Sequence, residues 1–410
     1  MVAALRPVAA LLFSVALLLM GNGLQGALLP LRASLELYST FAIGFLVSSY
    51  YVGFVTGCFS AAWFIRRAGH IRTFTAAVSL VSTTALLHVL VIDPLAWWLL
   101  RGISGFCFAV LYTIIESWLN EKATDANRGT VFSVYTIINL TVLTLGQLII
   151  TIGDPAAFPL FAVASVLLSV AAIPVALTRA EAPAPISSAR VRLTYLYHRS
   201  PAACAGAAAA GLANGAFWAL GPVFAADRAG ALTAADMVAF FLSAVVIGGA
   251  AGQWPLGRLS DQTDRRRILM LSAFGAAVFG VALALGSELF GSAVFVFGAL
   301  FGVFAFPIYA VSVAHLNDNV EPTDYVEAAS GMLLIFGIAA IVGPVLVSIV
   351  AANAGIDSLF LYTAAIHGLL FGYLWLRLFR RAASPEADQV AFTESIVAAQ
   401  TVSTVETIAE

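Results

Sequence analysis

The chain has 410 residues, of which 61% are hydrophobic and only 10% are charged, with a formal net charge of −2. Soluble globular domains carry about 25% charged residues, so this composition excludes an ordinary water-soluble protein. Apolar runs of about 20 residues, long enough to cross the hydrocarbon layer of a membrane as helices, recur along the whole chain. We predict an all-α integral membrane protein with twelve transmembrane helices, at 8–31, 41–65, 72–93, 95–120, 130–152, 156–178, 200–226, 237–257, 268–288, 291–316, 327–351 and 357–379.

Two other interpretations of the apolar runs are less favoured. The runs are continuously apolar and do not alternate every second residue, which argues against a transmembrane β-barrel. The first run follows Arg6, as in a secretory signal, but it continues to Pro30 without a small-residue cleavage site and has a counterpart later in the chain. We therefore interpret it as the first transmembrane helix.

The positive charges are distributed unevenly between the two sides that these helices define. All of the 20 Lys and Arg residues except Arg32, Arg101 and Arg228 fall on the side of the amino terminus. Because cytoplasmic loops retain an excess of Lys and Arg, this bias predicts that both termini are cytoplasmic.

The two halves of the chain are similar to each other. Polar and glycine positions of the first and fourth helices recur at a nearly constant spacing in the seventh and tenth. The matched pairs are Asn22 and Asn214, Gly23 and Gly215, Pro30 and Pro222, Gly105 and Gly302, Tyr112 and Tyr309, Leu119 and Leu316, and Asn120 and Asn317. Six helices per half leave both halves in the same orientation, so we predict two parallel-repeat six-helix bundles.

Breaks in the apolar pattern predict the domain boundaries. Residues 179–199 contain prolines, serines and four arginines, which is typical of a cytoplasmic linker. We expect an amino-terminal bundle over 1–178, this linker, a carboxy-terminal bundle over 200–381, and a polar, disordered cytoplasmic tail over 382–410.

The loop between the eighth and ninth helices carries a family motif. Residues 257–266 read Gly-Arg-Leu-Ser-Asp-Gln-Thr-Asp-Arg-Arg and resemble the major facilitator superfamily signature G-x-L-x-D-R-x-G-R-R, from which Gln262 and Asp264 depart. The matching positions are Gly257, Leu259, Asp261, Arg265 and Arg266. The equivalent loop between the second and third helices is a weaker match, with Arg66 where the family usually has aspartate.

Two further segments resemble one subgroup of that superfamily. Residues 116–120, Glu-Ser-Trp-Leu-Asn, and residues 253–257, Gln-Trp-Pro-Leu-Gly, are similar to the bacterial YcaD-type subgroup. The resemblance implies the major facilitator fold, a multi-pass protein of the bacterial inner (plasma) membrane, and a monomer. It also implies that the first, fourth, seventh and tenth helices line a central cavity.

Polar residues on those four helices are the candidates for solute binding. Burying a charged group in a membrane costs about 2.5–3.5 kcal/mol on insertion scales, so each such residue requires a reason. On the helix at 95–120, Arg101, Tyr112 and Glu116 fall on one stripe. The candidate cavity residues are Asn22, Gln25, Arg101, Tyr112, Asn214, Trp218 and Tyr309, and Glu116 is the candidate for proton coupling.

Each candidate has a structural alternative that the sequence leaves open. Arg101 lies one turn from Trp97 and Trp98, and its side chain could extend to the outer membrane interface. Glu116 could lie in the inner headgroup region and order the following loop. The intramembrane asparagines could join helices to each other as small polar residues often do.

The loops at the cytoplasmic side suggest a gate. The superfamily resemblance implies that Asp261 faces the start of the fifth helix, where Arg128 is the available cation. By the same symmetry, Arg66 is expected to face the start of the eleventh helix, where Glu321, Asp324 and Glu327 lie. We predict that the pairs Arg66 with Glu327 and Arg128 with Asp261 close this side when the protein opens outward.

These features favour secondary active or facilitative transport of a small solute by alternating access, with protons as a candidate coupling ion. The alternatives are a flippase for lipids or other amphiphiles, and a non-transporting membrane sensor built on a carrier-like scaffold. We expect no enzyme, cofactor, metal site or nucleic-acid partner, because the sequence contains no nucleotide-binding loop, no nucleophile and base arrangement, and no metal-ligand spacing.

Overall fold

The fold was obtained as a computed structural model that describes residues 8–123, 128–177, 189–286, 291–378, 392 and 405–406. The first half contains α2 (Ala9–Leu35), α3 (Thr40–Ala68), α4 (His70–Leu90), α5 (Pro94–Lys122), α6 (Arg128–Leu148), the short η2 (Ile149–Ile152), α7 (Phe158–Val170) and α8 (Ala172–Ala176). The second half contains β1 (Ala189–Arg190), α9 (Leu193–Arg199), α10 (Pro201–Asp227), α11 (Ala234–Ser260), α12 (Arg265–Gly286), α13 (Ala293–Ala305), α14 (Pro307–Asn317), η3 (Pro322–Asp324), α15 (Tyr325–Ala354), α16 (Ser358–Leu378) and β2 (Val405–Glu406), which pairs in parallel with β1.

The predicted number of membrane spans is confirmed. Within the described residues, twelve helical segments are long and apolar enough to cross a membrane. The tenth span consists of α13 and α14, which meet at Pro307, a residue without the N–H that a continuous helix needs.

Several spans begin at recognisable capping residues. Asp93 and Ser200 each accept a hydrogen bond from the backbone N–H three residues later, and each is followed by proline at the first helical position. Proline fits this position because its missing N–H would have no partner inside the helix anyway. These caps fix where α5 and α10 begin.

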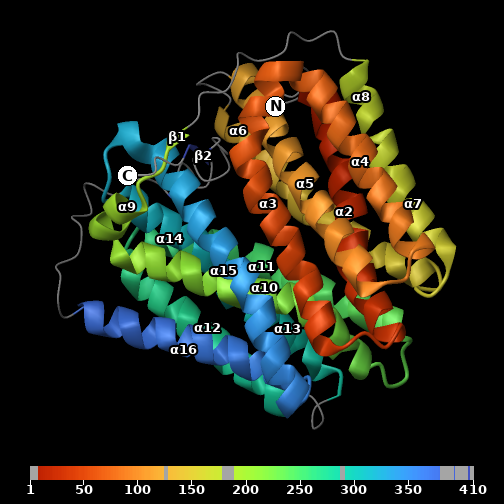
Figure 1. The fold of residues 1–410 in the computed structure, drawn as a ribbon. Coiled ribbons are helices and arrows are strands. Elements are labelled where there is room, and N and C mark those ends of the chain that lie inside the picture. The colour runs from red at the N-terminus through yellow and green to blue at the C-terminus, as the bar shows by residue number, and fades with distance from the viewer. Residues whose placement is uncertain are drawn as a thin grey trace.

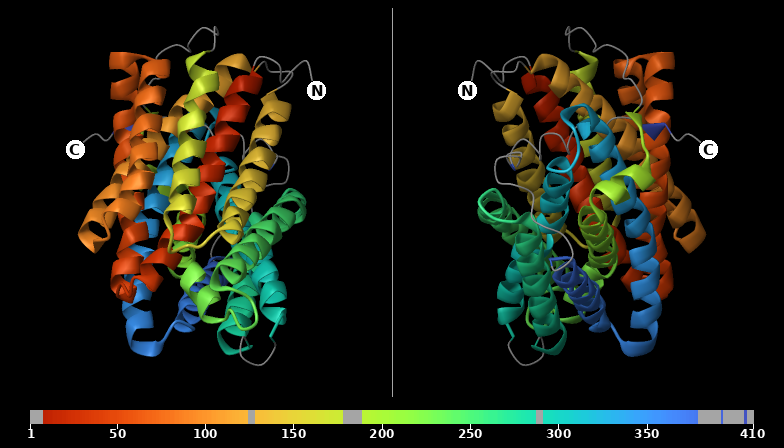
Figure 2. Two further views of the ribbon diagram at one scale, coloured as in Figure 1. Left: turned by 90° about the vertical axis from the view of Figure 1, so that its right-hand side faces the viewer. Right: turned by 90° about the vertical axis from the view of Figure 1, so that its left-hand side faces the viewer.

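The helices form two bundles, one from each half of the chain (Figure 1). In the views of Figure 2, the red to yellow helices of the first half fill the upper part, and the green and teal helices of the second half reach the lower part. The bundles meet chiefly where α3 packs on α15, α10 on α2 and α3, and α11 on α6. The predicted boundaries near 178–200 and 381 remain predictions, since residues 178–188 and most of 379–410 lie outside the described residues.

Equivalent helix pairs in the two bundles approach closely at equivalent glycines. A Cβ atom added to Gly105 of α5 would overlap the carbonyl oxygen of Tyr50 in α3. In the second bundle, a Cβ atom added to Gly302 of α13 would overlap the carbonyl oxygen of Val245 in α11. Small residues allow such backbone contact between membrane helices, so the repeat seen in the sequence corresponds to a repeated packing interface.

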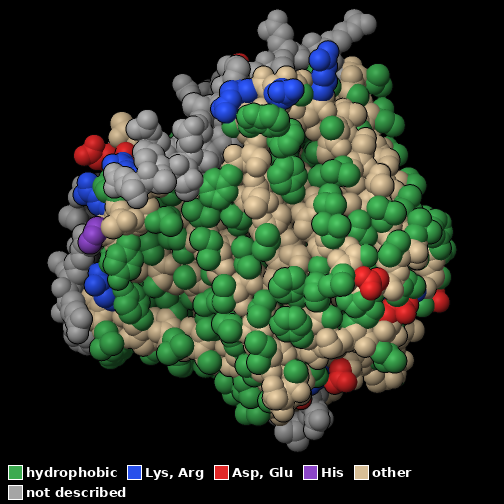
Figure 3. Space-filling model, viewed as in Figure 1, with side chains coloured by type: hydrophobic (Ala, Val, Ile, Leu, Met, Phe, Trp, Pro, Cys, Tyr) green, Lys and Arg blue, Asp and Glu red, His purple; other side chains and the backbone are tan. Residues whose placement is uncertain are grey.

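The two ends of the helices differ in charge. Exposed Arg66, Arg67 and Arg72 lie where α3 joins α4, and we call this the arginine-rich end. The opposite or far end carries exposed Asp93 and Asp154. Figure 3 shows Lys and Arg side chains along the top of one face and acidic side chains near its lower right, with a hydrophobic surface between them.

The bundles are joined from the far end to about the middle of α3 and α15. Near the far end, Gly44 packs against Pro344 and Ser348. Further along α3, the Ser48 hydroxyl donates a 2.7 Å hydrogen bond to the carbonyl oxygen of Ile341. These contacts close the interface between the bundles on the far side.

Candidate functional site

A cavity of about 300 Å³ lies between the two bundles. It is lined by Asn22, Gly23, Gly26 and Pro30 of α2, Leu46, Val47, Tyr50, Tyr51 and Phe54 of α3, Arg101 and Tyr112 of α5, Leu143 and Gln147 of α6, Trp218 of α10, and Leu333, Phe336 and Gly337 of α15. Of these 17 residues, only Trp218, Leu333, Phe336 and Gly337 belong to the second bundle.

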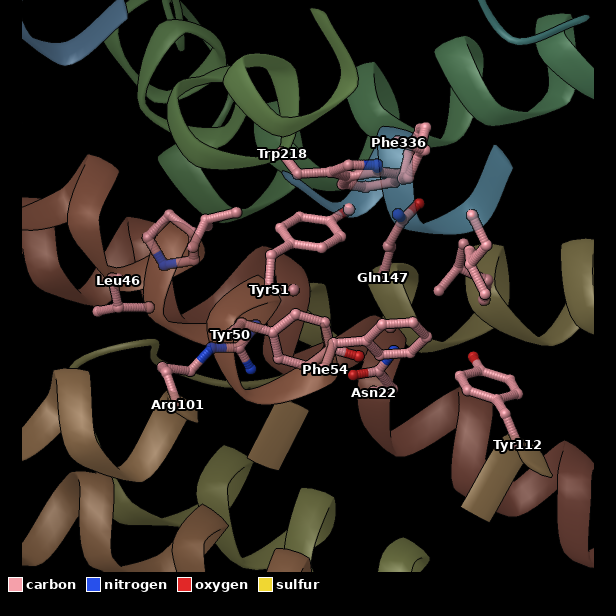
Figure 4. Close-up of a pocket in the computed structure, with 17 residues that line it drawn as sticks. Asn22, Leu46, Tyr50, Tyr51, Phe54, Arg101, Tyr112, Gln147, Trp218 and Phe336 are labelled. Carbon is pink, nitrogen blue, oxygen red and sulfur yellow. The ribbon is translucent and has the colours of Figure 1, made fainter. Parts of the chain in front are cut away.

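Six of the 17 lining residues are aromatic, and their rings form a continuous part of the cavity wall (Figure 4). Tyr50 and Tyr51 are adjacent on α3, with ring centroids 5.6 Å apart in an edge-to-face arrangement. The ring of Tyr51 contacts that of Phe336 across the bundle interface at 6.3 Å, and Phe54 contacts Tyr112 at 6.2 Å. This wall suits a flat apolar group, which binds aromatic side chains by stacking or by edge contacts.

A few polar groups interrupt the aromatic wall. Asn22 shares a hydrogen bond with Tyr50. Both amide atoms of Gln147 are buried without a hydrogen-bond partner. Buried polar groups are normally paired, so Gln147 is available for a polar group of a bound molecule.

Arg101 is the charged residue of the cavity. Its side chain is buried, and its guanidinium carbon lies 4.5 Å from the centroid of the Tyr50 ring. The Nε and Nη1 atoms have no hydrogen-bond partner. Its burial rules out the alternative in which this side chain extends to the membrane interface in this conformation.

The predicted cavity residues fall into two groups. Asn22, Arg101, Tyr112 and Trp218 line the cavity together. The remaining three, Gln25, Asn214 and Tyr309, are not among its lining residues. Gln25 is buried within α2, and Tyr309 packs its ring on Phe336 at 5.1 Å. The role of all seven in solute binding remains a prediction.

Several lining residues were not predicted. Tyr50, Tyr51, Gln147 and Phe336 lie on the second, fifth and eleventh spans, to which the resemblance assigned no cavity residues. Gln147 could have been found from the sequence, because an amide in an apolar span requires a reason just as Asn22 does. The adjacent Tyr50 and Tyr51 were a second available signal.

Glu116 lies outside the cavity lining. It is buried on α5 and shares a hydrogen bond with Tyr135 of α6. A buried carboxylate between two helices could carry a proton, and it also fits a purely structural link between α5 and α6. Proton coupling by Glu116 therefore remains a prediction.

The predicted gate pair of Arg66 and Glu327 is not formed in this conformation. Glu327 instead accepts hydrogen bonds from Nε and Nη2 of Arg192 at 3.0 and 2.8 Å, and from the Arg192 backbone N–H at 2.8 Å. Next to it, the Tyr195 hydroxyl donates a 2.6 Å hydrogen bond to Asp324. The short helix α9 of the predicted linker thus holds the start of α15, while Arg66 is exposed.

The second predicted gate pair can be described on one side only, because the side chain of Arg128 lies outside the described residues. Asp261 is 3.1 Å from Nη1 of Arg265 and accepts a 2.9 Å hydrogen bond from the backbone N–H of Phe392. Arg265 is fully buried and also pairs with Asp318 at 2.7 Å. In this conformation Asp261 is therefore bound within its own half of the chain.

Two six-helix bundles with a cavity between them are the architecture of one class of membrane transporters. Residues 11–287 and 203–406 match the model of the Major Facilitator Superfamily, and the chain belongs to this family of solute transporters.

Comparisons with individual proteins agree with this assignment. The chain is 24% identical over 384 residues to the "Uncharacterized MFS-type transporter YcaD" of Escherichia fergusonii, which covers 93% of this chain and 98% of the relative. It is 25% identical over 379 residues to the protein of the same name from Escherichia coli O17:K52:H18, covering 92% and 96%.

Solved structures show the same fold. The chain superposes on the nucleoside transporter NupG with a TM-score of 0.78 at 15% identity, covering 91% of this chain and 99% of that one. It superposes on a bacterial homologue of the human lysosomal transporter Spinster, in an inward-facing and occupied conformation, with a TM-score of 0.73 at 14% identity, covering 94% and 98%. The family match and the two YcaD relatives confirm the resemblance to a YcaD-type major facilitator protein, and the solved structures confirm the fold.

Proposed function

We propose that this chain carries a small organic solute across the membrane by alternating access, with the solute bound in the cavity between the bundles. The observation that carries the proposal is the cavity itself, a space of about 300 Å³ with unpaired polar atoms at the interface of the two bundles. Ligand sites range from about 300 to 1,000 Å³, so this volume favours a small solute over a lipid.

The contacts between the bundles suggest how access alternates. In this conformation α3 and α15 close the far side through Gly44, Ser48 and their partners. Opening that side requires these contacts to break. At the same time, the end of α3 and the start of α15, which both lie at the arginine-rich end of the molecule, would approach each other. Glu327 would then exchange Arg192 for Arg66, and Asp261 would pair with Arg128. These are the two gate pairs predicted from the sequence.

The distribution of Lys and Arg residues supports one orientation of the protein in the membrane. Lys and Arg are retained on the cytoplasmic side of membrane proteins, so we infer that the arginine-rich end is cytoplasmic and that both termini lie there. The present conformation is then closed toward the outside. A monomer in the bacterial inner membrane suffices, because both halves of the cavity come from one chain.

The test is a binding screen followed by uptake. The purified chain in detergent is screened by thermal shift against sugars, nucleosides, amino acids, organic acids and lipids, and each stabilising compound is then assayed in radiolabelled form for uptake into proteoliposomes. We expect saturable uptake that falls at least tenfold in Trp218→Ala, which removes a cavity wall. The matched control is Trp254→Ala, since Trp254 is 67% exposed on the outer surface of α11.

Other outcomes separate the alternative functions. Binding that depends on Trp218 without any uptake would contradict transport and favour the non-transporting sensor. Stabilisation by lipids alone, together with lipid transbilayer movement in the liposomes, would favour the flippase. Equal loss of uptake in Trp218→Ala and Trp254→Ala would mean that the loss does not depend on the cavity, and it would contradict binding of the solute there.

A further inference from the structure

We propose that the solute is a monoanion, a small planar carboxylate whose charged group binds Arg101 and whose flat apolar body lies between the aromatic residues of the cavity. This inference rests on the proposed carrier function and names the class of solute for the same cavity.

The argument begins with the buried arginines of the protein. Among the residues that the structure describes, four arginine side chains are buried: Arg32, Arg101, Arg265 and Arg266. Three of them pair with a carboxylate, namely Arg32 with Glu36 at 2.6 Å, Arg265 with Asp318 at 2.7 Å and Arg266 with Asp264 at 2.6 Å. Arg101 is the exception, and it is also the one that lines the cavity.

Acids on the same helix do not compensate Arg101. Glu116 is 15 residues further along α5, which corresponds to about 22 Å of helix, and it lies beside Tyr135. Asp93 caps the start of α5 by accepting a 2.9 Å hydrogen bond from the N–H of Ala96, and it is exposed. No carboxylate of the described residues lies within ion-pair distance of Arg101.

Among the described residues, the ring of Tyr50 is the aromatic partner that this guanidinium contacts. A cation over an aromatic ring recovers only part of the cost of removing the charge from water. A guanidinium offers parallel N–H donors that match the two oxygens of a carboxylate. Arg101 lines the cavity, and its Nε and Nη1 atoms have no hydrogen-bond partner, so its guanidinium keeps unused donors. Each of them belongs to one edge of the guanidinium, Nε with Nη2 or Nη1 with Nη2, through which a carboxylate could be bound.

The charge balance and the walls define the rest of the solute. One guanidinium neutralises one negative charge, so a dianion such as a phosphate monoester would leave a net buried charge. Tyr50, Tyr51, Phe54, Trp218 and Phe336 surround a flat body, and Gln147 offers both an amide donor and an acceptor for one further polar group. These features together favour an aromatic monocarboxylate with one or two rings.

The experiment compares carboxylates with neutral molecules of the same shape. Dissociation constants are measured by thermal shift and by tryptophan fluorescence for indole-3-acetate against indole-3-acetamide, for 4-hydroxyphenylacetate against its amide, and for phenyl phosphate as the dianion. We expect each carboxylate to bind at least tenfold more tightly than its amide, and phenyl phosphate to bind no better than the amides.

Variants then assign the charge preference to one residue. Arg101→Gln should abolish the preference for the carboxylate, Arg101→Lys should retain part of it, and Arg72→Gln, which removes an exposed arginine, should leave it unchanged. We also expect the unliganded Arg101→Gln protein to melt at the same temperature as the wild type or higher, because an uncompensated buried charge is gone. A purely structural arginine would give a lower melting temperature.

Several results would overturn the proposal: equal binding of acids and amides, a carboxylate preference that survives in Arg101→Gln, or no binding of any of the carboxylates. The comparison of acids with amides on the wild-type protein needs no variant, so it stands even if Arg101→Gln does not fold. Uptake of a neutral solute without carboxylate binding would contradict this inference alone. Carboxylate binding at Arg101 without uptake would support the site and contradict the carrier function.

Discussion

Single glycines determine how closely the helices of each bundle pack, and α5 offers a matched pair for testing this. Gly105→Ala should destabilise the protein by about 1–3 kcal/mol, the usual cost of overpacking, because its Cβ atom would overlap the backbone of α3 at Tyr50. Gly102→Ala is the control on the same helix, where the nearest atom to an added Cβ is the Ser49 carbonyl oxygen at 3.6 Å. The measurement is the melting temperature in detergent; equal effects of the two substitutions would contradict this account.

Residue chemistry also explains what could and could not be predicted about the site. Asn22, Arg101, Tyr112 and Trp218 were found because polar or amphipathic residues in apolar spans are costly and therefore conspicuous. The same reasoning selected Gln25, Asn214 and Tyr309, which are not among the residues that line the cavity. Helical periodicity relates residues to one face of their own helix, but it does not say which neighbour that face meets.

At the scale of one element, the start of α12 shows why this chain departs from the family loop. Asp264 stands where the signature has glycine, and its carboxylate accepts hydrogen bonds from the backbone N–H of Arg266 at 3.0 Å and from its guanidinium at 2.6 Å. Partial burial alone would raise the pKa of Asp264, but these bonds and the charge of Arg266 lower it below the usual aspartate value. Asp264 thus acts as a charged cap for α12.

The lowered pKa gives a pH dependence with a definite sign. A carboxylate whose pKa is lower in the folded state stabilises that state above its unfolded pKa, and this stabilisation is lost as the pH falls through the folded value. Asp264→Asn should therefore lower the melting temperature at pH 7, and the difference from the wild type should shrink below about pH 4. Glu121→Gln, which removes an exposed carboxylate, is the control; a difference that does not vary with pH would contradict the assignment.

At the same scale, the helices could be predicted well from the sequence, because each one needs about 20 mainly apolar residues to cross the membrane. Twelve apolar segments were expected and twelve are present within the described residues. The ends were less predictable, because capping and packing decide them. The helix α3, for example, continues to Ala68, three residues beyond the predicted end, before Gly69 turns the chain with a φ of 80°.

For the whole molecule, the contact between α3 and α15 should control the balance between the two conformations. Gly44→Trp would place a large ring against Pro344 and Ser348 and should shift the protein toward a state open on the far side. The reporter is Ser48→Cys, which replaces a side chain that is 1% exposed, in a background with the three native cysteines changed to serine. Labelling of this cysteine in cells by a membrane-impermeant maleimide should rise roughly tenfold, since overpacking by about 1.4 kcal/mol changes the population by that factor.

The control for this labelling is Phe41→Trp, which enlarges a residue of the same helix that is 42% exposed. It should leave the labelling rate of Ser48→Cys unchanged. If Gly44→Trp also leaves the rate unchanged, the far side either does not open or does not depend on this contact, and the alternating-access proposal fails at this step.

The arrangement of the two bundles could not have been obtained from the sequence alone. The internal repeat predicts that the halves resemble each other, and the glycine contacts of α5 and α13 agree with that. It does not predict how one half is tilted against the other. The cavity residues Tyr51 and Phe336 meet only because of that tilt, which is why neither was expected.

The cavity wall is divided unequally between the two repeats, and this has a consequence for how such proteins diversify. Thirteen of its 17 residues, including Arg101, Gln147 and Asn22, are encoded in the first half of the gene, whereas the second half supplies four. A duplicated ancestor with equal halves would have changed its specificity through either copy. In this descendant, recombination that exchanges the first half alone would transfer the charged and amide groups of the cavity, whereas Trp218 and Phe336 of the opposite wall would stay with the second half.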